Sequence, residues 1–454
     1  MTLPLIWIGL TAAVSYLIVR SIYRLYFHPL RSFPGPKLAA LTHAYEFYYD
    51  GVKGGQFIWE IQRMHEIYGP IVRINPRELH IKDPYYFDTI FTSRKQAKDP
   101  FMVRIFATPL STAATVEHDF HRYRRELVNP FFSKRLVMNL GHVVQNKVDK
   151  NLKNEFRDAV GSAGHLCHVT RFFSIMTMIV NAAPGLVEWM QPKSKGLFEA
   201  KRMIEKMARS AIENSPKADR HGPKTIFDAL CDKSVRPEER TIPRVRDEAM
   251  VVLGAGTETT ARVLTTGSYH LYRDGPRLEK LRAELKTIMP EPTSQISLVQ
   301  LEQLPYLTAV INESLRLAHT VMIRTPRISP TPLAYKDYII PPGTPVSEIF
   351  YFMHMDPSIF PQPETFNPER WLEPSSTGER LTKFLVAFSK GSRNCVGMNL
   401  AYSELYHMFA ALVRRFDLEI YNTPPESVHI TRDFMIGLPE SDAFKVYCLV
   451  TNAL

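Results

Sequence analysis

The sequence lacks any closely spaced pair of cysteines. Its four cysteines, Cys167, Cys231, Cys395 and Cys448, are spread along 454 residues, and no C-x-x-C motif occurs. Zinc knuckles and disulfide frameworks need cysteines in short, regular spacings, so the pattern argues against both. The sequence is instead typical of a protein whose folded body faces a reducing compartment.

The chain also has no low-complexity tract, no internal repeat and no lysine-arginine block interleaved with aromatic residues. The last of these absences argues against nucleic acid as a partner. With 45% hydrophobic and 22% charged residues, the chain has the composition of a globular protein with a large core, and no linker divides it. Its formal charge of +10 favours a basic docking face for an acidic redox partner or for anionic lipid.

Charge is missing altogether from residues 2–19, a run dominated by Leu, Ile, Val, Trp and Ala. As a helix, this run would be about 27 Å long, close to the hydrocarbon thickness of an endoplasmic-reticulum bilayer. Positive residues follow the run, beginning at Arg20 and Arg24, and none precedes it. We therefore predict a single transmembrane anchor at residues 1–24 with the body on the cytosolic side. A cleaved signal peptide would need a positive start and a small-residue cleavage site, which are not evident.

Proline and glycine mark the end of this segment. Phe33-Pro34-Gly35-Pro36 cannot continue a helix, so we predict a hinge at residues 25–40 and a folded body at residues 41–454. Early in the body, the alternating runs 71–74 and 79–81 flank Asn75-Pro76 and predict a short hairpin. Strand-like runs at 338–340, 428–430 and 444–450 predict further small sheets.

The most informative stretch is residues 388–397, which leads into a helical pattern that begins after Cys395. A cysteine at a helix N-terminus, with Arg393 nearby, is placed to be a thiolate and a metal ligand. Gly391 and Gly397 remove side-chain bulk on either side, so a flat macrocycle could approach the backbone closely. For an isolated cysteine the alternative is a small, buried and inert side chain.

Phe388, Gly391, Arg393, Cys395 and Gly397 match the pattern F-x-x-G-x-R-x-C-x-G. This stretch resembles the haem-binding loop of the cytochromes P-450, the haem-thiolate monooxygenases. The resemblance implies that haem b (iron protoporphyrin IX) is the cofactor, that Cys395 is the axial ligand of its iron, and that Arg393 pairs with a propionate.

A long central helix is predicted from Thr241 to the Gly275-Pro276 stop. Gly254 and Gly256 weaken it by about 1 kcal/mol each relative to alanine, a cost that close packing against a flat cofactor would explain. Residues 255–260 resemble the family's oxygen-activation motif. That resemblance implies that Glu258 and Thr259 deliver protons at the distal face of the iron. The alternative is an ordinary helix whose threonines bond their own carbonyl groups.

Glu313 and Arg316 are three residues apart on a predicted helix. Taken alone, such a pair is a surface ion pair of little consequence. In the cytochromes P-450, a pair at this position joins an arginine from a later Pro-Glu-Arg segment in a buried structural triad. Arg370 in Pro368-Glu369-Arg370 would supply the third member.

Three further residues resemble propionate partners of the family. His121 and Arg125 are four apart and share a helical face, although tryptophan is commoner than histidine at the first position. Without the resemblance, this segment would be a solvated basic face. Arg327 begins an extended region preceded by residues 321–323, which we expect to face substrate, as does the loop at residues 102–117.

The sequence departs from the family between the basic helix and the central helix. Relatives usually have more residues between these two helices. We therefore predict that segment 143–240 is shortened and that part of the pocket roof is missing. A catalytically impaired haem protein is therefore one alternative. A haem-thiolate isomerase or dehydratase that needs no oxygen is another, which the intact Glu258–Thr259 pair argues against.

Together these features predict a mainly α fold with small β-sheets, the cytochrome P-450 fold, with an N-terminal transmembrane helix. The resemblance implies a monooxygenase that takes O2 and electrons from NADPH through a membrane-bound NADPH-cytochrome P-450 reductase. Its substrate would be a small lipophilic molecule that it hydroxylates or epoxidises. The anchor, the hinge and Pro-Glu-Arg-Trp at 368–371 are most similar to fungal members that act on terpenoids and other secondary metabolites, in the endoplasmic reticulum membrane.

Overall fold

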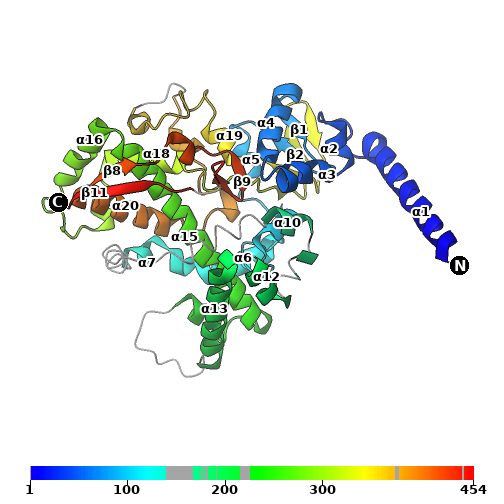
Figure 1. Cartoon of the computed structure of the whole chain (residues 1–454), viewed down its shortest axis with the longest axis horizontal. Helices are drawn as coiled ribbons and strands as arrows, with labels where there is room; N and C mark the ends of the chain where they lie inside the picture. Colours follow the sequence, from blue (N-terminus) through cyan, green and yellow to red (C-terminus); the bar gives the residue numbers. More distant parts are fainter. Residues whose placement is uncertain are drawn as a thin grey trace.

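The architecture was analysed in a computed structural model of the chain. It describes residues 2–139, 167–173, 175–176, 178, 182–190, 192–214, 225–373, 378–441 and 444–453. The predicted shortening of segment 143–240 falls in part outside these residues. Figure 1 shows a helical body with small sheets at both ends and a single helix, α1, projecting away from it.

The projecting helix α1 (Thr2–Ile22) continues into a π-helical turn, η1 (Tyr23–Phe27). Residues 6–27 form one span that is long and apolar enough to cross a membrane, with a mean hydropathy of 1.5 and no part buried inside the protein. Its apolar side chains, such as Trp7 at 64% exposure, have no protein surface to cover them. The predicted membrane segment is thus a free-standing helix, consistent with an anchor.

A mixed sheet stands next to the anchor. Its five strands run in the order β1-β2-β7-β4-β3. The predicted hairpin is confirmed, since β1 pairs antiparallel with β2 and Ile71 lies opposite Ile81. The strands are β1 (Ile71–Arg73), β2 (Leu79–Ile81), β3 (Ala97–Lys98), β4 (Arg327–Ile328) and β7 (Pro345–Ser347). Chain segments about 230 residues apart in sequence therefore meet in one sheet, where β3 pairs with β4.

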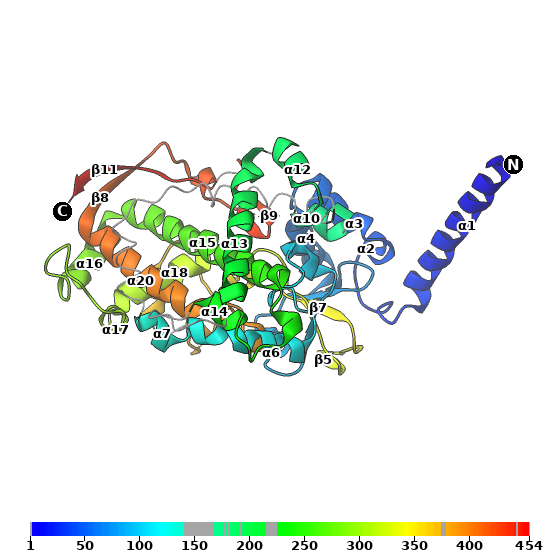
Figure 2. The ribbon, with the colours of Figure 1, turned by 90° about the horizontal axis from the view of Figure 1, so that it is seen from below.

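The long helix α15 (Ile242–Tyr272) crosses the centre of the body. Gly275 and Pro276, predicted as its stop, lie beyond its end and form the first turn of α16 (Gly275–Lys286). The helix begins after Thr241, as predicted, although the Thr241 side chain makes no capping hydrogen bond. Helix α15 packs against α18 (Pro305–Leu317) and α20 (Met398–Arg415), as Figure 2 shows. Gly267 permits this close crossing, because a Cβ atom there would overlap the Ser314 hydroxyl and the Phe409 ring. The largest apolar core fills this junction, and its fully buried members include Leu271, Leu281, Leu307, Val310 and Phe409.

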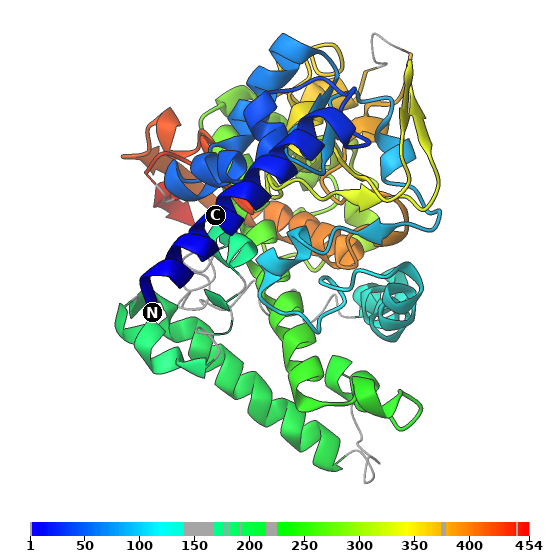
Figure 3. The ribbon, with the colours of Figure 1, turned by 90° about the vertical axis from the view of Figure 1, so that its right-hand side faces the viewer.

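Shorter helices surround this core. Figure 3 shows α12 and α13 in green on the far side of the body from the blue and yellow sheet region. The helices before α15 are α2 (Lys37–Leu41), α3 (Ala44–Phe47), α4 (Phe57–Tyr68), α5 (Phe87–Ile90), α6 (His118–Val128), α7 (Lys134–Asn139), α10 (Cys167–Phe172), α12 (Pro184–Met190), α13 (Lys195–Asn214) and α14 (Ile226–Leu230). Those after it are α16 (Gly275–Lys286), α17 (Leu298–Leu301) and α19 (Phe350–His354).

Three two-stranded sheets complete the fold, pairing β5 with β6, β8 with β11 and β9 with β10. The predicted strand at 338–340 is confirmed as β6. The prediction of a strand at 428–430 is wrong, because Pro424 and Pro425 start a 3-10 turn and pairing begins only at Arg432. The strands are β5 (Leu333–Tyr335), β6 (Tyr338–Ile340), β8 (Phe416–Tyr421), β9 (Arg432–Phe434), β10 (Ile436–Leu438) and β11 (Tyr447–Ala453).

Candidate functional site

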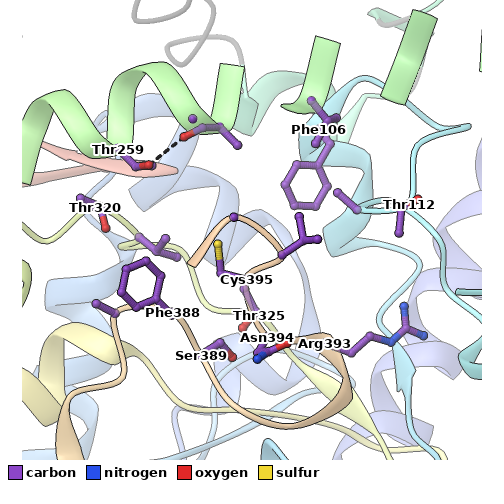
Figure 4. Close-up of a pocket in the computed structure, with 18 of the residues that line it drawn as sticks. Phe106, Thr112, Thr259, Thr320, Thr325, Phe388, Ser389, Arg393, Asn394 and Cys395 are labelled. Carbon is purple, nitrogen blue, oxygen red and sulfur yellow. Dashed lines mark hydrogen bonds between the residues drawn. The ribbon is translucent and has the colours of Figure 1, made fainter. Parts of the chain in front are cut away.

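A cavity of about 400 Å³ lies between α15 and the loop that precedes α20. This volume falls in the range of small-molecule sites. Figure 4 shows Cys395 at its centre, with the sulfur directed toward α15, and Phe106 and Phe388 on its walls. Apolar side chains from several elements line the cavity, including Met102, Val103, Ile105, Phe106, Val251, Val252, Val263, Val321 and Ile323.

The loop around Cys395 is closed by its own backbone. The Cys395 N–H donates to the Phe388 carbonyl oxygen at 2.9 Å, which brings the two ends of the loop together. Gly391 has a φ of +71°, and a Cβ atom there would overlap the backbone of Thr92. This glycine is thus required by a neighbouring chain segment, not by the approach of a macrocycle as we expected from the sequence. Gly397 lines the cavity, as do Phe388, Arg393, Asn394 and Cys395.

The thiol of Cys395 is exposed to the cavity. Its pKa differs from the sequence-based expectation. Enclosure by the surrounding protein raises the pKa of the Cys395 thiol above its ordinary value, and the Gly397 N–H and the Arg125 charge offset this only in part. Arg393 does not supply the expected stabilisation, because its guanidinium donates to the carbonyl oxygens of Thr115 and Val116 at 2.8 and 2.9 Å. A bound cation would be needed to make the thiolate the stable form.

Basic side chains gather along one edge of the cavity, and four of them, His121, Arg125, Arg327 and Arg393, were singled out in the sequence. His121 is 4% exposed, and burial together with the nearby Arg393 charge lowers its pKa to about 2. Burial also lowers the pKa of Arg327 to about 9 and that of Arg393 to about 10. The Arg125 guanidinium also contacts the Cys395 loop, since it donates to the Asn394 carbonyl oxygen at 2.7 Å.

Lys98 is a fifth basic side chain at this edge, and no sequence motif marked it. It lines the cavity, donates to the Ala113 carbonyl oxygen at 2.6 Å and lies directly opposite Arg327 in the β3–β4 pair. Burial and three neighbouring arginines hold the pKa of Lys98 well below its usual value. Like charges opposite one another weaken a sheet, so this register indicates an anion between them.

Within the described part of the chain, none of these five groups forms a salt bridge with a carboxylate. The Nε atom of Arg393 is buried and has no hydrogen-bond partner there. Buried cations are costly unless they are paired, so this edge is built for an anionic ligand. The site therefore combines a sulfur donor, apolar walls and a cationic edge.

Thr259 lies on α15, on the opposite side of the cavity from Cys395 (Figure 4). Its hydroxyl donates to the Ala255 carbonyl oxygen at 2.7 Å, which is the arrangement of an ordinary helical threonine. Glu258 is not among the residues that line the cavity. It is 7% exposed, and its carboxylate lies 3.5 Å from Arg262 on the same helix. The structure thus brings Thr259 to the cavity and leaves Glu258 on another face of α15.

Gly254 and Gly256 of α15 are not closely packed. A Cβ atom at Gly254 or Gly256 would meet no other atom within 4 Å. Gly256 lines the cavity, whereas Gly254 does not. The expected packing of both glycines against a flat cofactor is therefore wrong for Gly254, and for Gly256 the open space faces the ligand site.

The loop before α6 forms one wall of the cavity, as expected. Its 3-10 helix η3 (Met102–Phe106) contributes four apolar residues to the lining, Met102, Val103, Ile105 and Phe106. Farther along the loop, the Thr112 N–H donates to the Glu248 carboxylate at 2.8 Å. Glu248 on α15 also accepts from Arg244 at 2.6 Å, so a buried ion pair fixes this wall to the central helix.

Behind the cavity, the structure brings Glu313, Arg316 and Arg370 together. Glu313 and Arg316 are fully buried, and Arg316 donates twice to Glu313, at 2.7 and 2.9 Å. Arg370 donates to the same carboxylate at 3.2 Å. Trp371 adds a fourth contact, its indole N–H donating to Glu313 at 3.0 Å. Glu313 and Arg316 are thus not the surface pair that spacing alone would indicate.

A family model for cytochrome P450 matches residues 127–444, well over half of the chain. The chain belongs to the cytochrome P450 family. This P450 is also similar to fungal monooxygenases along nearly its whole length. It is 40% identical to the cytochrome P450 monooxygenase aflU of Aspergillus parasiticus, over 98% of this chain and 97% of that protein.

Two other fungal relatives are similarly close. The P450 is 38% identical to the conidiogenone synthase PchP450 of Penicillium rubens, with 96% of each chain covered. It is 36% identical to the cytochrome P450 monooxygenase TRI4 of Fusarium sporotrichioides, over 96% of this chain and 93% of that one. The aflU alignment spans 492 positions, more than the 454 residues here, so it includes positions at which this P450 has no residue.

Among solved structures, the fold matches a retinoic acid-bound cyanobacterial P450, CYP120A1. The TM-score is 0.68 at 20% identity, with 93% of this chain and 99% of that chain covered. The predicted P450 fold, mainly α with small sheets, is confirmed.

Haem is the cofactor that membership of the family implies, and the site fits it. Cys395 presents a sulfur donor to the cavity, and the buried cationic edge suits the two propionates. Lys98, His121, Arg327 and Arg393 would bind them, with Arg125 near the Cys395 loop.

His354 gives the P450 a testable dependence on pH. It is buried beside the triad, and its Nε2 atom accepts the Val386 N–H at 3.0 Å. Burial lowers the pKa of His354 to about 3, against about 6.5 in an unfolded chain. Between these values only the unfolded chain binds the proton, so the free energy of unfolding falls as the pH falls from 6.5 toward 3.

Glutamine at position 354 can accept the same N–H but cannot titrate. As the pH falls across this window, we expect the free energy of unfolding of His354→Gln to decrease by on the order of 2 kcal/mol less than that of the wild type. Urea unfolding at a series of pH values measures the difference. His65 and His270, whose burial lowers each pKa to about 4, remain in both proteins and provide the common background. Identical pH slopes for the two proteins would show that His354 does not titrate as described.

Proposed function

We propose that this P450 is a haem-dependent monooxygenase of fungal secondary metabolism. It hydroxylates or epoxidises a small lipophilic substrate, a terpenoid or a related metabolite, using O2 and electrons from NADPH. The observation that carries the proposal is the position of Cys395, whose sulfur enters a largely apolar cavity opposite Thr259 and next to the cationic edge. One relative is a conidiogenone synthase, which supports a role in making a fungal metabolite.

Haem bound through Cys395 would supply O2 activation, with the thiolate donating electron density to the iron. The chain contributes binding, orientation and exclusion of water. Phe106, Val252 and Ile323 are among the apolar residues that would hold a lipophilic substrate. Because the residues that line the cavity are mainly apolar, the shape of such a substrate would decide which carbon faces the reacting centre.

Thr259 would hold and move a proton at its Oγ1 atom. In the structure, that hydroxyl donates a hydrogen bond to the Ala255 carbonyl oxygen, and its oxygen can accept a hydrogen bond from water in the cavity. Glu258, next along the helix, would connect the hydroxyl to solvent only if its carboxylate left Arg262, which is 3.5 Å away. We therefore propose Thr259 as the residue nearest the reaction and Glu258 as a more remote proton donor.

Thr259→Ala should separate electron use from product formation. We expect NADPH consumption to continue, hydrogen peroxide to rise and product per NADPH to fall by about tenfold or more, because proton delivery becomes unspecific. Thr257→Ala is the matched control, since Thr257 makes the same bond to its own helix, 2.8 Å from the Leu253 oxygen, but does not line the cavity. The substrate for this assay would be identified by comparing the metabolites of strains with and without the gene. An unchanged product yield in Thr259→Ala would contradict the proton role.

The anchor and the electron donor follow from the same proposal. We propose that residues 1–24 span the endoplasmic reticulum membrane once, that residues 25–40 form a hinge, and that residues 41–454 are the cytosolic catalytic body. The free-standing apolar helix supports this division. An NADPH-cytochrome P-450 reductase in the same membrane would deliver electrons, attracted by the net positive charge of +10.

A haem-thiolate isomerase or dehydratase is the second candidate. The position of Glu258 favours it, because the carboxylate does not reach the cavity and such reactions need no proton delivery to bound oxygen. Turnover of the substrate without NADPH or O2 would support this candidate over the monooxygenase.

A further inference from the structure

A second buried ionic cluster lies behind the cavity wall, away from the cationic edge. It consists of Glu46, Asp50, Glu78, Arg171 and Arg324, none of which is more than 4% exposed. Its members come from α3, a π-helical turn, the β1–β2 turn, α10 and the segment after α18. We refer to it as the Glu46 cluster.

Arg324 connects the Glu46 cluster to the cavity, which it lines together with Val321 and Ile323. Its Nε atom donates to Glu78 at 2.8 Å, and its Nη2 atom donates to Glu46. An arginine can reach two carboxylates at once because its guanidinium is a rigid fork, whereas a lysine would offer a single point charge. The cavity wall at residues 321–324 is therefore fixed from behind.

Arg171 connects the same carboxylate to a different wall. Its Nη2 atom lies 3.1 Å from Glu46 and donates to Asp50 at 2.6 Å. The guanidinium also lies 5.6 Å from the Phe101 ring, immediately before η3, and α10 packs against η3. Since η3 supplies much of the apolar lining, Arg171 fixes a second part of the cavity.

Glu46 is thus shared by the two arginines that fix the two walls. Although its burial favours the neutral acid, the charges of Arg324 and Arg171 hold the pKa of Glu46 far below its usual range. Asn75 also donates to Glu46, at 3.1 Å. Loss of the negative charge of Glu46 would leave the buried guanidinium groups of Arg324 and Arg171 with less opposite charge around them. The two groups would then repel each other.

We propose that Glu46 is a positioning residue for the substrate cavity. By binding Arg324 and Arg171 together, it sets the distance between the wall at residues 321–324 and the wall at η3, and so determines which lipophilic substrates fit. This inference rests on the proposed function, since it concerns the cavity next to the haem.

The test compares two nitrogen ligands of haem iron by their optical shifts in the full-length holoprotein. Imidazole is small enough to bind without contacting the two cavity walls, whereas 4-phenylimidazole must fit between them. We expect Glu46→Gln to weaken binding of 4-phenylimidazole by about tenfold while the imidazole affinity changes by less than about twofold. Arg324→Lys, which keeps the charge but loses the fork, should show the same selective loss if Glu46→Gln does not fold.

Glu60→Gln is the matched control. Glu60 is also a buried carboxylate of the N-terminal region, bonded to Arg63 and Tyr45, but it does not line the cavity or contact the cluster's arginines. It should change neither affinity. Equal losses for both ligands in Glu46→Gln, or no loss for either, would overturn the positioning role alone. A wild-type protein that binds no imidazole would overturn the proposed function and this inference with it.

Discussion

Cys395→Ser should abolish product formation and remove the thiolate-type absorption of the reduced, carbon monoxide-bound protein. Serine keeps the size and position of the side chain, but its hydroxyl does not replace a thiolate as an electron-donating ligand. The fold should survive, because the Cys395 side chain faces the cavity and its backbone N–H still donates to the Phe388 oxygen. Loss of function with a retained fold would therefore isolate the sulfur itself.

The matched control for this variant is Cys448→Ser. Cys448 is exposed on β11 and does not line the cavity. Product formation and the absorption spectrum should equal those of the wild type. Measurable product from Cys395→Ser, or an unaltered spectrum, would show that another residue binds the iron.

Arg316→Met has the second largest expected effect, a loss of about 3–5 kcal/mol in the free energy of unfolding. The substitution leaves Glu313 without its closest cation and frees the carbonyl oxygens of His354 and Pro363, which Arg316 binds at 2.9 and 2.6 Å. Because the unfolding energy of a whole protein is of similar size, the variant should fail to accumulate with haem at 37 °C. Chemical unfolding of the detergent-solubilised protein, with haem content as a second readout, measures both effects.

An exposed ion pair provides the control for Arg316. Arg122 and Glu126 lie 3.6 Å apart on α6, with side chains 74% and 64% exposed. Arg122→Met should cost less than about 1 kcal/mol, because solvent screens such pairs. If both arginine variants lost the same stability, burial would not explain the importance of the Glu313 triad.

Local sequence patterns predicted those parts of the molecule that local chemistry determines. The start of α15 after Thr241 was predicted in this way, and so was the hairpin, from the alternation around Asn75-Pro76. The Cys395 loop was recognised because its spacing is carried by ten consecutive residues. Burial of Glu313 could be foreseen only through the family resemblance, since spacing alone gives the same pattern for a surface pair.

Features that depend on distant chain segments could not be predicted in this way. Lys98 joins the cationic edge because β3 pairs with β4, which is about 230 residues away. Gly391 is required by the backbone of Thr92, and the direction of Glu258 is set by Arg262. The raised pKa of the Cys395 thiol likewise reflects the enclosure of the whole site, which outweighs the local helix terminus.

The most direct test of this account is the absorption spectrum of the purified wild-type protein, reduced and exposed to carbon monoxide. Coordination of haem iron by the Cys395 sulfur predicts the Soret band of a thiolate-ligated haem. A Soret band typical of imidazole ligation, or a colourless protein after haem supplementation during expression, would contradict it.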